Sequence, residues 1–213
     1  MLTGPFAHCQ IRWGLTGTVP KQEYEYMGIK VGLGEVTNKI PAKDLQDKGV
    51  LANCHVNVLQ TNDILEFRSY AEELKWLTTD AKRMSWVAQT INDISTSGNT
   101  LILVDRISAG EILEKKIKDS VFIRGATKNM ERKEHYDEVS TAQTKVIIAT
   151  YGVAAVGINI PRIFNLVLIE PGKSFVRVIQ SIGRGIRKAE DKDSVNIWDI
   201  TSACKFARRH LTQ

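Results

Sequence analysis

The sequence has little of several residue types, and each shortage excludes a class of protein. Its 213 residues include only three cysteines, Cys9, Cys54 and Cys204. They are far apart, so we expect reduced thiols and neither a disulfide framework nor a zinc site. No apolar run reaches the roughly 18 residues that a transmembrane helix needs. The N-terminus also lacks the basic and apolar regions of a signal peptide, so we expect a cytoplasmic protein with no membrane partner.

The remaining composition is that of a folded protein. Hydrophobic residues make up 43% of the chain and charged residues 25%, which argues against intrinsic disorder. Lysine and arginine outnumber aspartate and glutamate by 29 to 24, a net charge of +5. This excess is compatible with an anionic partner without requiring one.

From about Gln60 onward, strand-like and helix-like segments alternate along the chain. The expected strands are short apolar runs, typical of strands buried on both faces: Leu101–Asp105, Val121–Ile123, Lys145–Ala149, Leu166–Glu170 and Val195–Ile200. The expected helices lie between them: Arg68–Ser97 with a break near Asp80, Ala109–Lys118, Lys128–Thr141 and Ser174–Arg187. This alternation predicts an α/β fold with a parallel sheet and helices on both faces.

The first 48 residues have a different texture. Ile11–Leu15 is a candidate strand, but a single strand cannot build a sheet. The following stretch, Gly28–Gly49, is rich in glycine and lysine and weakly periodic. We therefore predict a remnant or linker over residues 1–48 and a folded domain over residues 49–213.

Three patterns that imitate phosphate or metal sites are rejected. Gly172-Lys173-Ser174 follows an expected strand and opens an expected helix, but position 167 is Val167 where a P-loop requires glycine. The loop is too short to hold a triphosphate. A small-molecule kinase with its phosphate site at this loop is therefore also excluded. Ser174 is expected to cap the helix. Asp105 and Asp199 resemble magnesium-binding aspartates, but we expect ordinary acids at strand ends.

The segment Ser174–Arg187 is the most informative. Its apolar residues form one stripe at helical spacing, whereas Arg177, Gln180, Arg184 and Arg187 fall on the opposite face. A solvated basic face would explain this pattern. However, the stripe contains arginine and no lysine, and arginine suits bidentate phosphate recognition. Gly183 and Gly185 flank Arg184 at a cost of about 1 kcal/mol each in helix stability, which favours a close approach by a ligand or backbone.

These residues resemble a known family. Gln180-Ser-Ile-Gly183-Arg184-Gly-Ile-Arg187 resembles motif VI of superfamily 2 helicases, and further matches follow the family's order. They are Leu15–Thr18 for motif III, Leu101–Arg106 for motif IV, Gly125-x-Thr127 with Arg132 for the segment before motif V, and Ala149–Pro161 for motif V. Within this family, the sequence resembles the UvsW-type DNA helicases of T4-like phages.

The resemblance implies a RecA-like second motor domain and a role for each matched residue. Arg184 and Arg187 would be arginine fingers on the γ-phosphate of ATP, where a positioned arginine stabilises developing charge. Three groups complete the implied site: Gln180, Gly183, Gly157 and Asn159 at the nucleotide cleft; Thr127, Thr150 and Arg106 on DNA; and Thr16 and Thr18 coupling hydrolysis to movement. Capping of the following helix is the alternative role for Thr127 and Thr150.

The resemblance also implies partners. ATP with Mg²⁺ would be shared with a first RecA-like motor domain, in cis or in trans, that this sequence lacks, and DNA would be held by its backbone without sequence specificity. We thus expect the C-terminal motor portion of an ATP-dependent DNA helicase, inactive alone and located in the host cytoplasm if it is a phage protein. The alternative is a non-catalytic module that binds nucleic acid or docks on another motor subunit.

Overall fold

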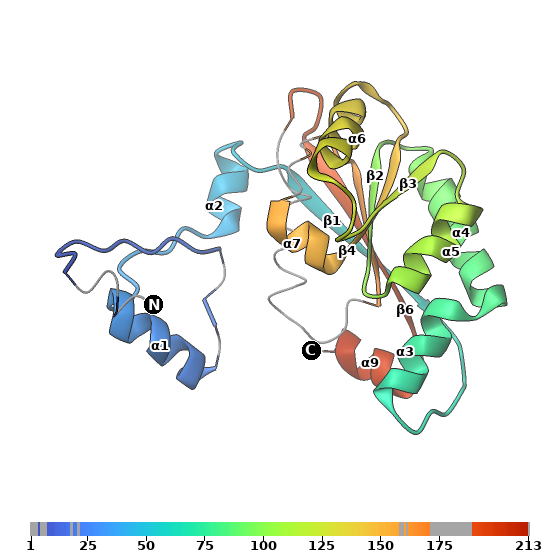
Figure 1. Ribbon diagram of the computed structural model, residues 1–213, viewed down its shortest axis with the longest axis horizontal. Coiled ribbons are helices and arrows are strands. Elements are labelled where there is room, and N and C mark those ends of the chain that lie inside the picture. The colour runs from blue at the N-terminus through green and yellow to red at the C-terminus, as the bar shows by residue number, and fades with distance from the viewer. Residues whose placement is uncertain are drawn as a thin grey trace.

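A six-stranded parallel sheet forms the body of the protein (Figure 1). The computed structural model describes residues 4, 8–17, 19–20, 22–157, 160, 162–170 and 189–212, with residues 155–157 as backbone only. The strand order is β1-β6-β5-β2-β4-β3, and every neighbouring pair is parallel. The strands are β1 Asn53–Thr61, β2 Thr100–Val104, β3 Ser120–Ile123, β4 Val146–Thr150, β5 Asn165–Ile169 and β6 Ser194–Ser202. The predicted α/β fold is confirmed.

Helices connect the strands and cover both faces of the sheet (Figure 1). They are α1 Glu23–Leu33, α2 Ala42–Asp47, α3 Tyr70–Thr79, α4 Ala81–Ser95, α5 Ile107–Lys116, α6 Asn129–Thr141, α7 Tyr151–Gly157 and α9 Lys205–Leu211. The predicted break near Asp80 is confirmed, since Asp80 ends α3 and its carboxylate accepts the Arg83 N–H at 2.8 Å to cap α4. The predicted helix Ser174–Arg187 lies outside the described residues.

Two apolar cores lie on the two faces of the sheet. Strand β2 shows how one sequence supplies both, because its five residues are all buried and alternate between faces. Leu101 and Leu103 pack in the core beneath α6 and α7, whereas Ile102 and Val104 pack in the core beneath α4 and α5. Burial on both faces explains why the central strands are continuous apolar runs.

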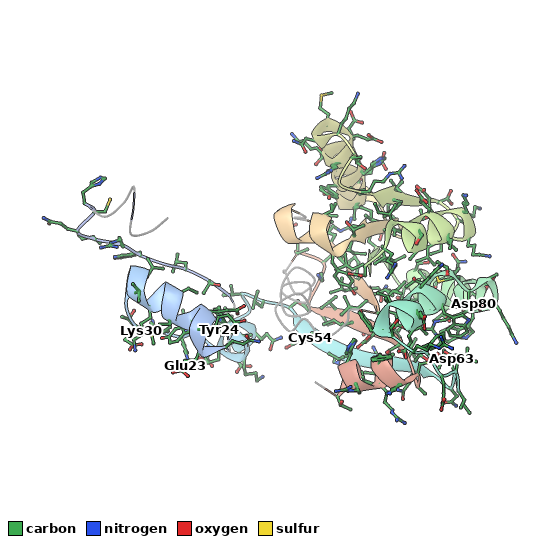
Figure 2. All side chains as sticks on the ribbon, turned by 60° about the horizontal axis from the view of Figure 1, so that its bottom comes forward. Glu23, Tyr24, Lys30, Cys54, Asp63 and Asp80 are labelled. Atoms are coloured by element: carbon green, nitrogen blue, oxygen red, sulfur yellow. The ribbon has the colours of Figure 1, made fainter. Side chains whose placement is uncertain are left out.

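The N-terminal part departs from the sequence prediction. Ile11–Leu15 forms no strand, and its Trp13 and Leu15 are 86% and 96% exposed. This segment contains residues that favour strands, but an isolated strand has no neighbouring strand to satisfy its N–H and C=O groups. It therefore does not form a β-strand. The segment predicted to be a remnant or linker, residues 1–48, contains α1 and α2. Helix α1, which carries Tyr24 and Lys30, stands apart from the sheet (Figures 1 and 2).

The start of the alternating region also differs from the prediction. Alternating strands and helices were expected only from about Gln60, but strand β1 begins before that residue. It begins at Asn53 and pairs with β6 along nine residues. Its polar positions, such as Asn53 and Asn57, obscured it, since an edge strand is not required to be apolar on both faces. The boundary after residue 48 stays a prediction. None of the helices in the described part of the chain is long and apolar enough to cross a membrane.

Candidate functional site

Three of the predicted DNA-contacting residues lie at one edge of the sheet. Thr150 ends β4, Arg106 follows β2 by two residues, and Thr127 follows β3 by four. These strands are adjacent in the order β2-β4-β3 and parallel, so their carboxyl ends meet at the same edge. In open α/β sheets, ligands bind outside the carboxyl ends of the strands. We call this edge the carboxyl edge.

Arg106 stands at the N-terminus of helix α5. It is the N-cap residue, in an extended conformation, and its side chain makes no capping hydrogen bond. Its Nε atom is buried and has no hydrogen-bond partner among the described residues. Because Nε is closed to solvent, the terminal nitrogens of this half-buried side chain are the donors that suit a phosphate oxygen, to which arginine binds through two parallel hydrogen bonds.

Thr127 closes the loop between β3 and α6. Its N–H donates to the Arg124 carbonyl at 2.9 Å, and its Oγ1 accepts the Arg124 N–H at 3.1 Å. The loop is fixed further by Arg132, whose guanidinium donates to the carbonyls of Arg124 and Gly125 at 3.0 and 2.7 Å. Capping of α6 by Thr127 is therefore wrong, because Lys128 is the N-cap residue and Thr127 bonds back to the strand end.

Thr150 does cap the helix that follows it. Its Oγ1 accepts the Val153 N–H at 3.4 Å, in the first turn of α7. A threonine hydroxyl that accepts a hydrogen bond still has its own O–H to donate. The structural role of Thr150 and a contact with a phosphate oxygen are thus compatible, and the same holds for Thr127.

Helix N-termini and basic side chains favour an anion at the β2-β4-β3 half of this edge, where Asp105 is the acid that directly follows β2. Helices α5 and α6 both begin there, with 10 and 13 residues, and a helix N-terminus presents unpaired N–H groups and a partial positive charge. The arginines and lysines around these N-termini add full charges. They are Arg106, Arg124, Lys128 and Arg132. Arg124 is partly neutralised, since it pairs with Glu111 at 2.8 Å on an exposed surface.

Of the remaining predicted site residues, the structure describes two. Thr16 is exposed in the segment before α1, and Gly157 is the last residue of α7. The other predicted residues lie outside the described residues: Thr18, Asn159, Gln180, Gly183, Arg184 and Arg187. Their predicted roles stay predictions.

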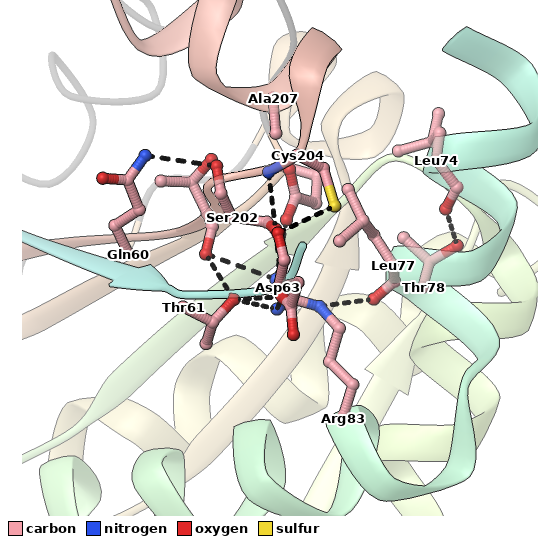
Figure 3. A network of polar contacts seen from close by, with 12 residues as sticks. Gln60, Thr61, Asp63, Leu74, Leu77, Thr78, Arg83, Ser202, Cys204 and Ala207 are labelled. Carbon is pink, nitrogen blue, oxygen red and sulfur yellow. Dashed lines mark hydrogen bonds and ion pairs between the residues drawn. The ribbon is translucent and has the colours of Figure 1, made fainter. Parts of the chain in front are cut away.

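The sequence did not predict a buried polar cluster around Arg83, which lies at the opposite half of the same edge (Figure 3). Arg83 of α4 is 5% exposed and pairs with Asp63 after β1 at 2.9 Å and with Glu170 after β5 at 2.8 Å. Asp63 also accepts the Ser202 hydroxyl at 2.9 Å, which attaches β6. A signal for this cluster existed, because Arg83 lies on the apolar face of α4 beside Met84 and Val87, and a buried arginine requires partners.

Two carboxyl groups near this cluster have raised pKa values. Burial raises the pKa of Glu170 to about 8; Arg83 opposes this shift, and the neighbouring acids Asp199 and Glu73 add to it. Burial also raises the pKa of Asp199 to about 6, and its Oδ1 atom has no partner among the described residues. Asp199 lies inside β6, three residues before its end, so its prediction as a strand-end acid is wrong. Asp105 directly follows β2, as predicted.

Glu170 also has an unusual backbone conformation. Its φ of 45° is in the left-handed region, which a side chain other than glycine, asparagine or aspartate seldom adopts. The hydrogen bond that its side chain accepts from Arg83 at 2.8 Å and the end of β5 hold it there. The described residues contain no group of three His, Cys, Asp or Glu side chains arranged to hold a metal ion.

Comparison with known proteins gives a consistent result. The helicase conserved C-terminal domain matches residues 82–189, about half of the chain. The ATP-dependent DNA helicase UvsW of Enterobacteria phage T4 is 24% identical over 204 residues, which cover 91% of this chain. The chain spans 41% of the length of that relative.

Solved structures show the same fold. The crystal structure of T4 UvsW superposes with a TM-score of 0.59 and 24% identity, covering 71% of this chain and 32% of that one. The S. cerevisiae protein Dbp5, in a structure bound to RNA and ADP BeF3, superposes with a TM-score of 0.61 and 15% identity. That match covers 92% of this chain and 46% of Dbp5.

Proposed function

Because the chain belongs to the helicase conserved C-terminal domain family, we propose that it is the C-terminal motor portion of an ATP-dependent DNA helicase or translocase. The observation that carries this proposal is the carboxyl edge, where Arg106, Thr127 and Thr150 lie beside two helix N-termini. The name of the T4 relative supports DNA as the substrate. Fork unwinding and branch migration, in recombination or repair, are the activities proposed for the intact motor.

The proposed role of the carboxyl edge is to hold the nucleic-acid backbone. Hydroxyl groups, helix N–H groups and a guanidinium all donate hydrogen bonds, and phosphate oxygens accept them. None of these donors reads a base edge, so binding is indifferent to sequence and depends on salt. The two threonine hydroxyls are held in place by the bonds that they accept from Arg124 and Val153, so little side-chain freedom is lost on binding.

A salt series tests this role directly. The affinity of the chain for a fluorescein-labelled single-stranded DNA, measured by fluorescence anisotropy, is expected to fall with log salt at a slope of about −1.4 to −2.8, which corresponds to two to four phosphates at about 0.7 each. Arg106→Gln should make the slope shallower by about 0.7. Lys115→Gln, an equal loss of charge at the exposed C-terminus of α5, is the matched control.

Binding that ignores salt, or that strongly prefers one sequence, would contradict the proposal. An unlabelled RNA strand of the same sequence, used as a competitor, decides between DNA and RNA as the substrate. The proposal for DNA requires an unlabelled DNA strand to compete better than the RNA strand. Equal competition would contradict a preference for DNA, because the backbone phosphates are common to both.

ATP with Mg²⁺ is proposed to bind between this domain and a first motor domain, with Arg184 and Arg187 as arginine fingers and Gln180, Gly183, Gly157 and Asn159 lining the cleft. The order of the motifs along the chain supports these assignments. In a fusion of a first motor domain to this chain, Arg184→Ala or Arg187→Ala should lower ATP turnover by about 10³–10⁵, and lysine should rescue poorly because it lacks the planar fork. The 213-residue chain alone should show no ATPase. Turnover that is indifferent to both arginines would favour the non-catalytic module instead.

A further inference from the structure

Helix α9 presents a cationic face that the assignments above do not use. At about 100° per residue, Lys205, Arg208 and Arg209 fall within an arc of about 100°, opposite Ala207. All three are exposed, whereas Ala207 is 4% exposed and packs inward. Two helical turns therefore carry three positive charges directed to one side.

Ion pairs do not explain this face, although Lys205 Nζ lies over the Phe206 ring, 5.6 Å from its centroid. None of the ion pairs among the described residues includes Lys205, Arg208 or Arg209. The nearby acid Glu73 is 1% exposed and already accepts the N–H groups of Phe206 and Ala207 at 3.0 and 2.6 Å. Cations in the last turn complement the helix dipole, but Lys205 is in the first turn, where a cation opposes it.

An aromatic group flanks the cationic face. The Tyr70 ring, at the start of α3, contacts the His210 ring edge-on with centroids 4.8 Å apart and the Phe206 ring at 6.3 Å. Tyr70 is 38% exposed. Positive charge beside exposed aromatic rings is the combination that binds single-stranded nucleic acid, because the charges follow the backbone and the rings stack on unpaired bases.

The position of α9 connects this face to the carboxyl edge. Helix α9 follows β6, and β6 runs parallel to β2 and β4, so α9 begins at the edge that carries Arg106 and Thr150 (Figure 1). In the strand order β6-β5-β2-β4, β2 lies two strand-to-strand distances from β6, and β4 lies three. At about 4.8 Å per spacing this is about 10–14 Å, a distance that a single strand covers with a few phosphates.

We propose that the cationic face of α9, with Tyr70 beside it, is a second contact for the backbone of single-stranded nucleic acid. It extends the footprint on the carboxyl edge from the β2-β4-β3 half to the β6 half. The inference rests on the proposed function, since it requires that this edge holds nucleic acid.

The test compares three double variants of the full chain with the wild type, using a fluorescein-labelled thymidine homopolymer in the salt series described above. Arg208→Gln/Arg209→Gln should make the slope shallower by about 1.4 and weaken binding about 10- to 30-fold at about 0.1 M salt. Arg208→Lys/Arg209→Lys keeps both charges and should keep the slope. Lys115→Gln/Lys118→Gln removes the same charge from exposed residues at the far end of α5 and just beyond it and should leave binding unchanged.

Tyr70→Leu separates stacking from charge. Base stacking is not a phosphate contact, so binding should weaken severalfold without a change in slope. A binding curve equal to that of the wild type would contradict the assignment to single strands.

The outcomes distinguish the two proposals. If the wild type fails to bind, the proposed function fails. If the wild type binds with the expected slope and Arg208→Gln/Arg209→Gln binds equally well, α9 is not a contact, although the carboxyl edge remains one. A shallower salt slope in Arg208→Lys/Arg209→Lys would also exclude a phosphate contact at α9, because this variant keeps both charges. The cationic face of α9 would then suit a protein partner.

Discussion

At the scale of single residues, Glu170 is the acid whose pKa is raised most among the described residues. It is 5% exposed, its φ is 45°, and its pKa is raised to about 8 from 4.5 by burial. The folded protein therefore keeps a proton on Glu170 up to about pH 8, whereas the unfolded chain releases it near pH 4.5. Between these values the folded state binds more protons, so the free energy of unfolding falls as the pH rises.

This difference in bound protons gives a measurable slope of the free energy of unfolding against pH. Between pH 6 and 8, above the pKa of Asp199, Glu170 should lower the free energy of unfolding by at most about 1.4 kcal/mol per pH unit. Glu170→Gln does not titrate and still offers an oxygen to Arg83, so the slope should become shallower. Urea denaturation at a series of pH values measures it. Glu134→Gln, at an exposed position on α6, is the control, and an equal change in both variants would argue against a proton held at Glu170.

The buried side-chain amide of Asn99 connects segments that are far apart in the sequence. The Asn99 side chain donates to the carbonyls of Val139, Ala142 and Arg162 at 3.0–3.1 Å and accepts the Lys145 N–H at 2.8 Å. These partners are 40 to 63 residues away along the chain. Nothing in the local sequence around Asn99 indicates them, and the same is true of the pair Arg83–Glu170, 87 residues apart. Such pairings depend on the complete fold and were not predictable.

At the scale of elements, the buried strands were predictable and the edge strand was not. The runs in β2, β4 and β5 are apolar throughout because both faces of these strands are covered, and such runs appear directly in the sequence. Strand β1 has a neighbour on one side only and is a mixture of exposed and half-buried residues. Its pattern resembles a loop with scattered apolar residues, so its start was missed.

Helix α5 can approach the sheet closely because it contains a glycine. A Cβ atom on Gly110 would overlap three ring atoms of Phe122 on β3. Gly110→Ala should therefore destabilise the protein by about 1–3 kcal/mol, although alanine is the better helix former by about 1 kcal/mol. Urea denaturation measures the change. Adding Phe122→Leu should recover part of the loss, because it removes the ring that the methyl group meets.

Gly152 of α7 is the matched control for Gly110. A Cβ atom there would meet nothing within 4 Å. Gly152→Ala should leave stability unchanged or raise it by about 0.5–1 kcal/mol. If both alanine variants lose the same stability, the contact between α5 and Phe122 is not the cause.

At the scale of the whole molecule, topology brings the predicted residues together. Arg106, Thr127 and Thr150 are spread over 45 residues of sequence, yet parallel pairing of β2, β4 and β3 places the ends of their strands at one edge. The sequence predicted the parallel sheet, so this meeting follows from it. The surface on α9 was not predicted, because helix α9 itself was not, and its aromatic neighbour Tyr70 is 140 residues from His210.

The central claim is that nucleic acid binds along the carboxyl edge. Amide chemical-shift mapping of the isotope-labelled chain, titrated with a single-stranded oligonucleotide, tests it most directly. The account predicts that shifts concentrate at Arg106, Thr127, Thr150 and α9, and that Asn99 and Lys145, which precede β2 and β4 at the opposite edge, stay unchanged. Shifts centred on Asn99 and Lys145, with the carboxyl edge unaffected, would contradict it.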